Sequence, residues 1–351
     1  MNRRTFLATG FAAGATVPLA QAAPLPNRPA APRGIVLFTA DRQILFVDEF
    51  GKTLKKFDAL TLVEEGWQPI AVSPSGTRAA FLEDPPGRNF TEHQRLRIAS
   101  LVHEFQPWET KATPANNFFV WSRDGKSLIG DRWVLPVQFL GPSYLHNIQI
   151  DLGTGNWSDL QLPAIAPNQI PKPFTEHRVY DCSPDGQWLL TTSLEEGKFA
   201  RIHLVGRDGK TRRPLTDPQP EVGRAQFSPD GKTVLFSRIT MSKAVLPCQR
   251  WLEARRSRYQ LDLFSLKIAG GAPTGIASIV MHSDHDQYVQ FAWRPDGKRI
   301  VLLYQQPWGP PGEELLDRPR LITCNPDGSD RKSNRINNEY LEGFITLHGW
   351  R

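Results

Sequence analysis

The stretch Gln226-Phe-Ser-Pro-Asp-Gly-Lys-Thr-Val-Leu-Phe236 predicts two apolar strands joined by a tight turn. Proline sets φ at one turn position, the aspartate bonds the turn backbone, and glycine accepts a positive φ. The apolar residues on either side fit strands that are packed between neighbouring sheets. The stretch therefore predicts a β-hairpin whose strands are both buried.

This hairpin is repeated along the chain. The other copies are Ala71–Phe81, Val120–Ile129, Asp181–Leu190 and Ala292–Val301. A second, weaker hairpin stands between successive copies, for example at Ala200–Lys210 and Leu261–Gly271, and residues 94–101 are a degenerate version of it. Two hairpins make four short strands, which is one blade of a β-propeller.

The two ends of the chain supply a sixth blade. Trp350-Arg351 lines up with Trp293-Arg294, just before the turn, whereas Gly34–Ala40 has no innermost strand before it. Pairing of the N- and C-terminal strands completes one blade and closes the ring, which leaves only short, protected sheet edges. The sequence thus predicts an all-β fold, a six-bladed β-propeller of four-stranded blades over residues 34–351, with roughly 56 residues per blade.

The Ser-Pro-Asp-Gly-Lys hairpins resemble those of the TolB-type, WD-like six-bladed propellers. The resemblance covers nearly all of the chain beyond residue 33. It implies the fold but not one function, because the family includes binding, scaffolding and enzyme-appended propellers.

The N-terminus resembles a twin-arginine export signal. Residues 1–22 are predicted to be the signal peptide, 23–33 a proline-rich linker and 34–351 the propeller. The stretch before Ala23 is too short and too mildly apolar for a permanent span, although an uncleaved anchor or a chance pair of arginines stays the alternative. We therefore expect a periplasmic or extracellular protein exported by the twin-arginine route. The signal and cleavage residues are Arg3, Arg4, Phe6, Leu7, Ala20 and Ala22.

Charge and motifs exclude several classes of function. The formal net charge is +6 and falls to about +4 without Arg3 and Arg4, and no long basic run is interleaved with aromatic residues, so nucleic acid is not an expected partner. Cys182, Cys248 and Cys324 are far apart and odd in number, so no disulfide framework is implied. The chain has no Gly-x-Ser-x-Gly elbow, P-loop, dinucleotide fingerprint, Cys-x-x-Cys-His or His-Glu-x-x-His motif.

The face opposite the Pro-Asp-Gly turns carries the insertions. Rigid scaffolds often place binding on such a loop-rich face, although loop variation without function costs little and remains the alternative. The insertions are Glu83–His93, Asp131–Tyr144, Gln161–His177, Arg238–Arg258 and Gln305–Arg318.

Several polar and aromatic residues of these loops are candidates for ligand binding. His177, His282 and His285 are expected near the mouth of the central channel, where they could share a divalent metal; a hydrated polar rim is the alternative. The segment Cys248–Arg258 is predicted to be a short basic helix, with either an anion-binding or a solvated face. The full set is His177, His282, Asp284, His285, Arg238, Arg255 and Trp308.

These observations favour a non-catalytic binding or scaffold protein. Its expected partner is an envelope protein segment or a small polar ligand at the loop-rich face. No catalytic residue is assigned, and a divalent metal is the one cofactor that the candidate residues allow. The alternative is a metal-dependent hydrolase or lyase with a His and carboxylate site at the channel mouth.

Overall fold

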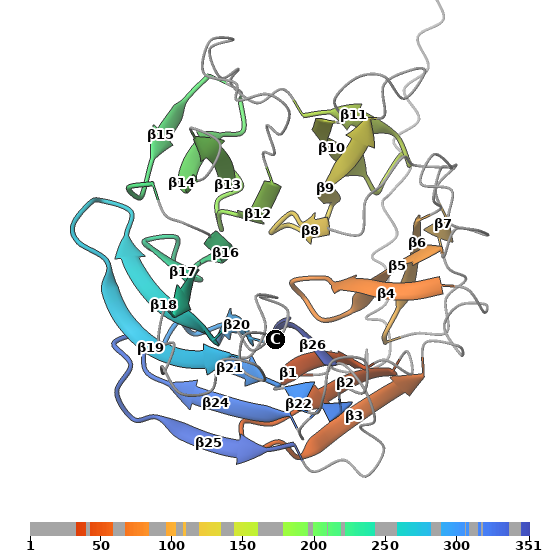
Figure 1. Cartoon of the computed structure of the whole chain (residues 1–351). Helices are drawn as coiled ribbons and strands as arrows, with labels where there is room; N and C mark the ends of the chain where they lie inside the picture. Colours follow the sequence, from red (N-terminus) through yellow and green to blue (C-terminus); the bar gives the residue numbers. More distant parts are fainter. Residues whose placement is uncertain are drawn as a thin grey trace, which may run out of the picture. The chain divides into compact units, whose positions relative to one another are not determined.

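A computed structural model shows six four-stranded antiparallel sheets that follow one another around a ring (Figure 1). They belong to one compact unit, Ala31–Arg351. The described residues are 33–39, 43–58, 67–83, 96–102, 108–109, 119–134, 144–160, 178–195, 199–208, 210–218, 222–242, 258–281, 289–305, 307–308, 315–316, 319–336 and 345–351. The predicted all-β six-bladed propeller is confirmed.

Each blade has one strand next to the centre of the ring and three strands farther out. Blade 1 is β26 (Ile345–Trp350), β1 (Ile35–Thr39), β2 (Gln43–Val47) and β3 (Thr53–Asp58). Blade 2 is β4 (Trp67–Val72), β5 (Arg78–Glu83), β6 (Leu96–Ser100) and β7 (Trp108–Glu109). Blade 3 is β8 (Phe119–Trp121), β9 (Ser127–Val134), β10 (Tyr144–Asp151) and β11 (Trp157–Asp159).

The other three blades follow the same order. Blade 4 is β12 (Arg178–Cys182), β13 (Trp188–Glu195), β14 (Phe199–Gly206) and β15 (Arg212–Pro214). Blade 5 is β16 (Val222–Phe227), β17 (Thr233–Ser242), β18 (Arg258–Lys267) and β19 (Thr274–Met281). Blade 6 is β20 (Val289–Trp293), β21 (Ile300–Tyr304), β24 (Arg320–Cys324) and β25 (Lys332–Arg335).

The ring is closed by the two ends of the propeller, as the sequence predicted. Strand β26 pairs antiparallel with β1, from Ile35 opposite Trp350 to Thr39 opposite Ile345. The N–H of Gly34 donates to the carbonyl of Arg351 at 2.8 Å, and the N–H of Arg351 donates back at 2.8 Å. Blade 1 therefore joins both ends of the chain in one sheet.

The repeated turns have the geometry that their residues dictate. In blade 4 the N–H of Gly186 donates to the carbonyl of Ser183 at 2.9 Å, and the φ of Gly186 is 72°. Oδ1 of Asp185 accepts hydrogen bonds from the hydroxyl of Ser183 and from the N–H of Gln187, the latter at 3.0 Å. These two hydrogen bonds lower the pKa of Asp185. A type I turn followed by a left-handed glycine joins each such pair of strands.

The core lies between blades, and a buried strand such as β1 contributes to two interfaces. In β1, Val36 and Phe38 pack towards blade 2 with Phe81, whereas Ile35 and Leu37 pack towards blade 6. This division follows from the period of two along a strand. Both faces are buried, which explains why the strands are apolar throughout.

Two features of the loop-rich side differ from the sequence prediction. Strand β17 continues to Ser242 and β18 begins at Arg258, so the predicted insertion starts later than Arg238. Alternating residues such as Ile239, which is buried, continue the ladder beyond the expected strand end. The segment Gln305–Arg318 contains a small antiparallel pair, β22 (Pro307–Trp308) with β23 (Leu315–Leu316), which was not predicted.

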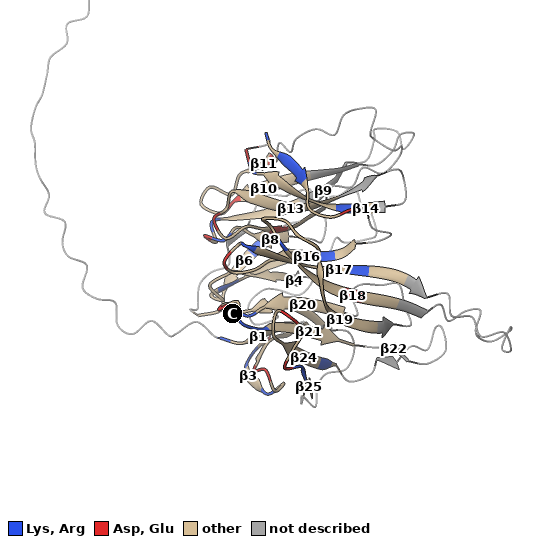
Figure 2. Cartoon of the chain, turned by 90° about the vertical axis from the view of Figure 1, so that its left-hand side faces the viewer, with Lys and Arg blue, Asp and Glu red and all other residues tan. Residues whose placement is uncertain are grey.

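The two free cysteines within the described ranges, Cys182 and Cys324, are buried in strands, as expected for small apolar side chains. Those ranges contain no helix long and apolar enough to cross a membrane. In a side view the strands are mostly free of charged residues, and many of the Asp and Glu segments lie on the side that carries the C-terminus (Figure 2). That side is also the one on which β26 ends, level with the Pro-Asp-Gly turns.

Candidate binding site

Four of the strands that face the centre of the ring carry a β-bulge, at similar distances from the turn. In β26, Val36 pairs with Gly349 and Leu37 with Leu347, so His348 between them has no partner on β1. A bulge leaves one residue outside the ladder and redirects its side chain. The bulged positions are Ile70, Tyr180, Gly223 with Arg224, and His348.

Charged residues of distant blades interact across the centre of the ring. Arg351, at the end of β26 in blade 1, and Asp181, in β12 of blade 4, each act on the other's pKa. Blades 1 and 4 stand opposite one another (Figure 1), so this interaction must cross the centre. Arg123, in the turn of blade 3, acts on both residues, and Arg224 of blade 5 acts on His348 of blade 1.

We call these five residues the axial cluster: Arg123, Asp181, Arg224, His348 and Arg351.

Asp181 is held by backbone N–H groups of two neighbouring blades. Its Oδ2 accepts from the N–H of Phe227 in blade 5 at 2.8 Å, and its Oδ1 accepts from the N–H of Cys182 at 2.9 Å. Burial raises the pKa of Asp181 to about 6, while these bonds and the charges of Arg123 and Arg351 oppose that rise. The carboxylate is therefore ionised at neutral pH.

Arg351 folds back over its own strand. One Nη donates to the carbonyl of Val72 in blade 2 at 3.2 Å and to that of His348 at 3.4 Å. A Cβ on Gly349 would lie 3.0 Å from the guanidinium, so glycine makes this conformation accessible. Burial, and then the charge of Arg123, lowers the pKa of Arg351 to about 10, which leaves it charged at neutral pH.

The Nε–H of Arg351 is buried and has no acceptor among the described residues. A buried donor without a partner costs about 1–3 kcal/mol, so this N–H adds to the cost of burying Arg351.

His348 is a neutral member of the cluster. Its ring stacks on Phe38, with the centroids 3.7 Å apart, and its Nε2 lies 2.8 Å from Oγ1 of Thr346. Burial lowers the pKa of His348 to about 3, with Arg224 and Arg351 adding to the effect and a hydrogen bond to the backbone of Ile70 opposing it. The axial cluster therefore contains three cations and one anion at neutral pH.

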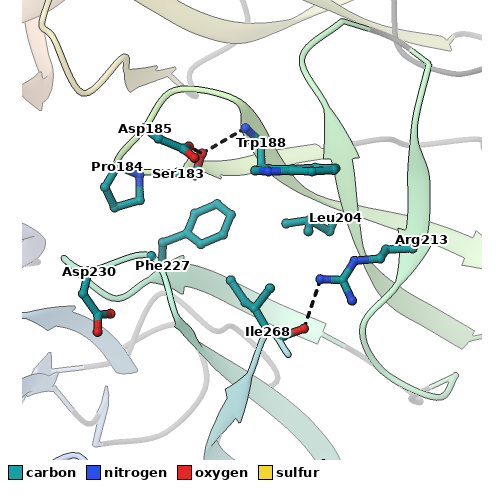
Figure 3. Close-up of a pocket in the computed structure, with 10 residues that line it drawn as sticks. Ser183, Pro184, Asp185, Trp188, Leu204, Arg213, Phe227, Asp230 and Ile268 are labelled. Carbon is teal, nitrogen blue, oxygen red and sulfur yellow. Dashed lines mark hydrogen bonds between the residues drawn. The ribbon is translucent and has the colours of Figure 1, made fainter. Parts of the chain in front are cut away.

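A groove on the turn side lies between blades 4 and 5 (Figure 3). Its volume is about 260 Å³, and its apolar wall includes Trp188 and Phe227. Arg213 donates to the carbonyl of Ile268 at 3.0 Å, while Asp185 and Asp230 each accept turn hydrogen bonds. Because its polar groups already have partners and it is smaller than typical ligand pockets, the axial cluster is the stronger candidate.

The predicted site residues are only partly within the described chain. Arg238 lies in β17, where it pairs with Asp262 at 3.2 Å and stacks 4.7 Å above the ring of Phe264. Trp308 lies in β22. Outside the described residues are His177, His282, Asp284, His285 and Arg255, together with the signal residues Arg3, Arg4, Phe6, Leu7, Ala20 and Ala22.

Among the described residues, no group of three or more His, Cys, Asp or Glu side chains could hold a metal ion. Sequence reasoning did not find the axial cluster. One available signal was Arg123, which stands where most other turns have proline.

No family model matches this sequence, and no curated protein matches it. Among solved structures, TolB from Acinetobacter baumannii is similar with a TM-score of 0.56 at 16% identity, covering 90% of this chain and 66% of that chain. The fold is that of a TolB-type propeller.

Two further similar structures have lower scores. A TolB candidate from Agrobacterium tumefaciens has a TM-score of 0.49 at 15% identity, covering 90% of this chain and 91% of that one. The periplasmic gluconolactonase PpgL of Pseudomonas aeruginosa has a TM-score of 0.46 at 12% identity, covering 90% and 99%. At these identities the TolB-type likeness establishes the fold alone, and the chain spans just under two thirds of the Acinetobacter TolB chain.

Proposed function

We propose that this chain is an exported, non-catalytic binding protein of the TolB type that captures a protein segment or a small polar ligand. The observation that supports this most is the axial cluster, in which charged groups from four blades converge and one buried N–H has no acceptor. A closed ring of six interlocked blades holds such groups in fixed positions, which reduces the entropy cost of binding.

Neighbouring blades are pinned to one another close to the cluster. Besides the bond from Phe227 to Asp181, the N–H of Trp293 in blade 6 donates to Oε1 of Gln226 in blade 5 at 3.3 Å. The two acceptor residues occupy equivalent positions: Asp181 is one residue before the end of β12, and Gln226 is one residue before the end of β16. These bonds favour a preformed site over one that rearranges on binding.

Export by the twin-arginine route and a periplasmic or extracellular location are part of the same proposal. They rest on the sequence of residues 1–22 and especially on Arg3 and Arg4. Replacing both arginines by lysine in the full-length chain is expected to keep the protein in the cytoplasm with its N-terminus uncleaved. Unchanged export of that variant would contradict the route.

The binding role is tested with the mature chain from residue 23, exported by its native route and purified without chelators. We expect it to capture a specific envelope component and to turn over no member of a panel of ester, lactone and uronate substrates. Turnover that is abolished by His285→Ala would contradict the non-catalytic role and support a metal-dependent hydrolase or lyase. An elemental analysis of the same sample provides an independent measure of bound metal.

A further inference from the structure

We propose that the groove between blades 4 and 5 binds an arginine side chain of a protein partner. Its guanidinium lies against the rings of Trp188 and Phe227 and pairs with the carboxylates of Asp185 and Asp230, all of which line this one groove. The inference rests on the proposed function and deepens it, because it names the chemistry of the captured segment. It concerns a second place on the turn side of the ring, apart from the axial cluster.

The chain itself places arginines at the corresponding position between other blades. Between blades 2 and 3, the guanidinium carbon of Arg78 lies 5.1 Å from the ring centroid of Trp121, and an Nη donates to the carbonyl of Gly125. Between blades 6 and 1, the guanidinium carbon of Arg294 lies 5.6 Å from the ring centroid of Trp350. Each arginine covers the aromatic residue that ends the inner strand of the next blade. A guanidinium is attracted to an aromatic face at such distances.

The groove between blades 4 and 5 has the aromatic residues but no such arginine. Phe227 ends β16, at the place of the two tryptophans just described. Blade 4 carries Trp188 and Ser183 at the two positions from which blades 2 and 6 supply their arginines. Among the described residues, no cation lies over the ring of Phe227 or of Trp188. A cation from another molecule therefore finds an aromatic wall that the chain's own arginines do not cover.

Two touching turns bring the carboxylates to one end of the groove. A Cβ on Gly231 would lie 3.2 Å from Cδ of Pro184, so the Ser-Pro-Asp-Gly turns of blades 4 and 5 are in contact there. Asp185 and Asp230 lie towards the side of Pro184, whereas Arg213 lies on the other side of the groove (Figure 3). A bound cation is therefore attracted to the carboxylate end and repelled from the opposite end.

Each carboxylate keeps one oxygen for a ligand. The turn hydrogen bonds of Asp185 and Asp230 all end on Oδ1, which accepts from the serine hydroxyl of the same turn and from the N–H two residues on. No other residue in the described part of the chain donates to either Oδ2. Both side chains are exposed, and the turn bonds lower the pKa of both, so both are ionised at neutral pH. Two carboxylates beside an aromatic wall suit the planar, forked guanidinium better than an ammonium.

The size of the groove fits one side chain. Its volume is about 260 Å³, below the roughly 300–1,000 Å³ of typical small-molecule pockets. Trp188 is half-buried, and Phe227, which is 5% exposed, forms the floor. Leu204 and Ile268 complete the apolar wall, along which the aliphatic part of an arginine can pack. A side chain carried by a protein segment therefore matches the groove better than a free small molecule does.

The test is an NMR titration of the isotope-labelled mature chain at neutral pH and low salt. The probe is the capped peptide acetyl-Gly-Arg-Gly-amide. We expect saturable shifts of the Trp188 indole N–H signal and of the backbone N–H signals of Gly186 and Gly231. The same peptide with neutral citrulline in place of arginine should bind at least about fivefold more weakly, because the shape is kept and the charge is lost.

Two double variants of equal charge separate the groove from the rest of the surface. Asp185→Asn with Asp230→Asn keeps an Oδ1 for the turn N–H groups, removes both charges, and should weaken arginine-peptide binding by roughly 3- to 30-fold. The matched control, Asp124→Asn with Asp296→Asn, makes the same change at equivalent turns of blades 3 and 6 and should stay within about twofold of the wild type. Trp188→Leu, followed by the glycine signals, should weaken binding by roughly 2- to 10-fold.

Each outcome decides the question. Arginine-peptide binding that is weakened only by the groove variants supports the proposal. No saturable shift of the groove signals in the wild-type chain, equal binding of the citrulline peptide, or equal weakening by the two double variants would overturn it. Tighter binding of acetyl-Gly-Lys-Gly-amide would contradict the assignment to arginine. Capture of an envelope component by Asp185→Asn with Asp230→Asn, with arginine-peptide binding lost, would leave the proposed function standing and contradict this groove as its site.

Discussion

Replacing His348 by glutamine should change how the stability of the propeller depends on pH. In the folded chain the pKa of His348 lies at about 3, because of burial and the nearby Arg224 and Arg351, whereas an unperturbed histidine has a pKa of 6.5. Between pH 3 and 6.5, His348 is therefore protonated in the unfolded chain and neutral in the folded chain. The stability associated with the neutral ring is present above pH 6.5 and is lost as the pH falls towards 3.

Asp181 acts in the opposite direction over much of the same range. Its pKa is raised to about 6 by burial, despite its N–H partners and Arg123 and Arg351, so the folded chain keeps a proton that the unfolded chain releases near 3.8. The stability from this group is present below pH 3.8 and is lost as the pH rises through 6. Each group contributes a slope of about 1.4 kcal/mol per pH unit, and between pH 4 and 6 the two slopes nearly cancel.

His348→Gln removes one of the two slopes. Relative to the wild type, the variant should gain about 3 kcal/mol in free energy of unfolding when the pH is lowered from 6.5 to 4. Asp181→Asn should show the opposite trend and lose stability more steeply in acid. Urea unfolding followed by tryptophan fluorescence at four pH values measures both differences. A difference between His348→Gln and wild type that stays constant within about 0.5 kcal/mol would refute a neutral, desolvated His348.

Other substitutions test the packing and the glycine that accommodates Arg351. Phe46 is fully buried between blades 1 and 2, so Phe46→Ala should cost about 3–5 kcal/mol in urea unfolding, whereas Phe50→Ala, at a side chain 60% exposed, should cost less than about 0.5 kcal/mol. Similar losses in both would contradict the interblade core. Gly349→Ala should destabilise the chain by about 1–3 kcal/mol, because φ is 130° and the added Cβ meets the Arg351 guanidinium. Gly270→Ala, with φ at 116° and no atom within 4 Å of the Cβ, reports the backbone strain alone, so it should cost less than Gly349→Ala in the same urea unfolding.

The ring and its closure could be predicted because they depend on local chemistry. The Ser-Pro-Asp-Gly turn requires proline, aspartate and a left-handed glycine at fixed places. Gly186 has the expected positive φ, and its N–H donates to the carbonyl of Ser183. Trp350 aligned with Trp293, and this alignment led directly to the pairing of β26 with β1.

The axial cluster could not be predicted in the same way. The bulge at His348 is a shift in pairing between two strands. Gly349, next to the bulge, was an available signal because glycine inside a strand often marks a bulge, but one glycine does not show which residue leaves the ladder. Asp181 and Arg351 act on each other's pKa only because six blades place blade 1 opposite blade 4, so this interaction depends on the whole ring. The pair β22 and β23 was missed because a proline-rich segment reads as a loop, even though short edge strands tolerate proline.

The most direct test of the account is a crystal structure of the mature chain. The account predicts a ring closed by the pairing of β26 with β1. It also predicts that the Asp181 carboxylate accepts the N–H groups of Cys182 and Phe227, and that the Arg351 guanidinium donates to the carbonyl of Val72. An open ring, or Asp181 and Arg351 directed away from its centre, would contradict it.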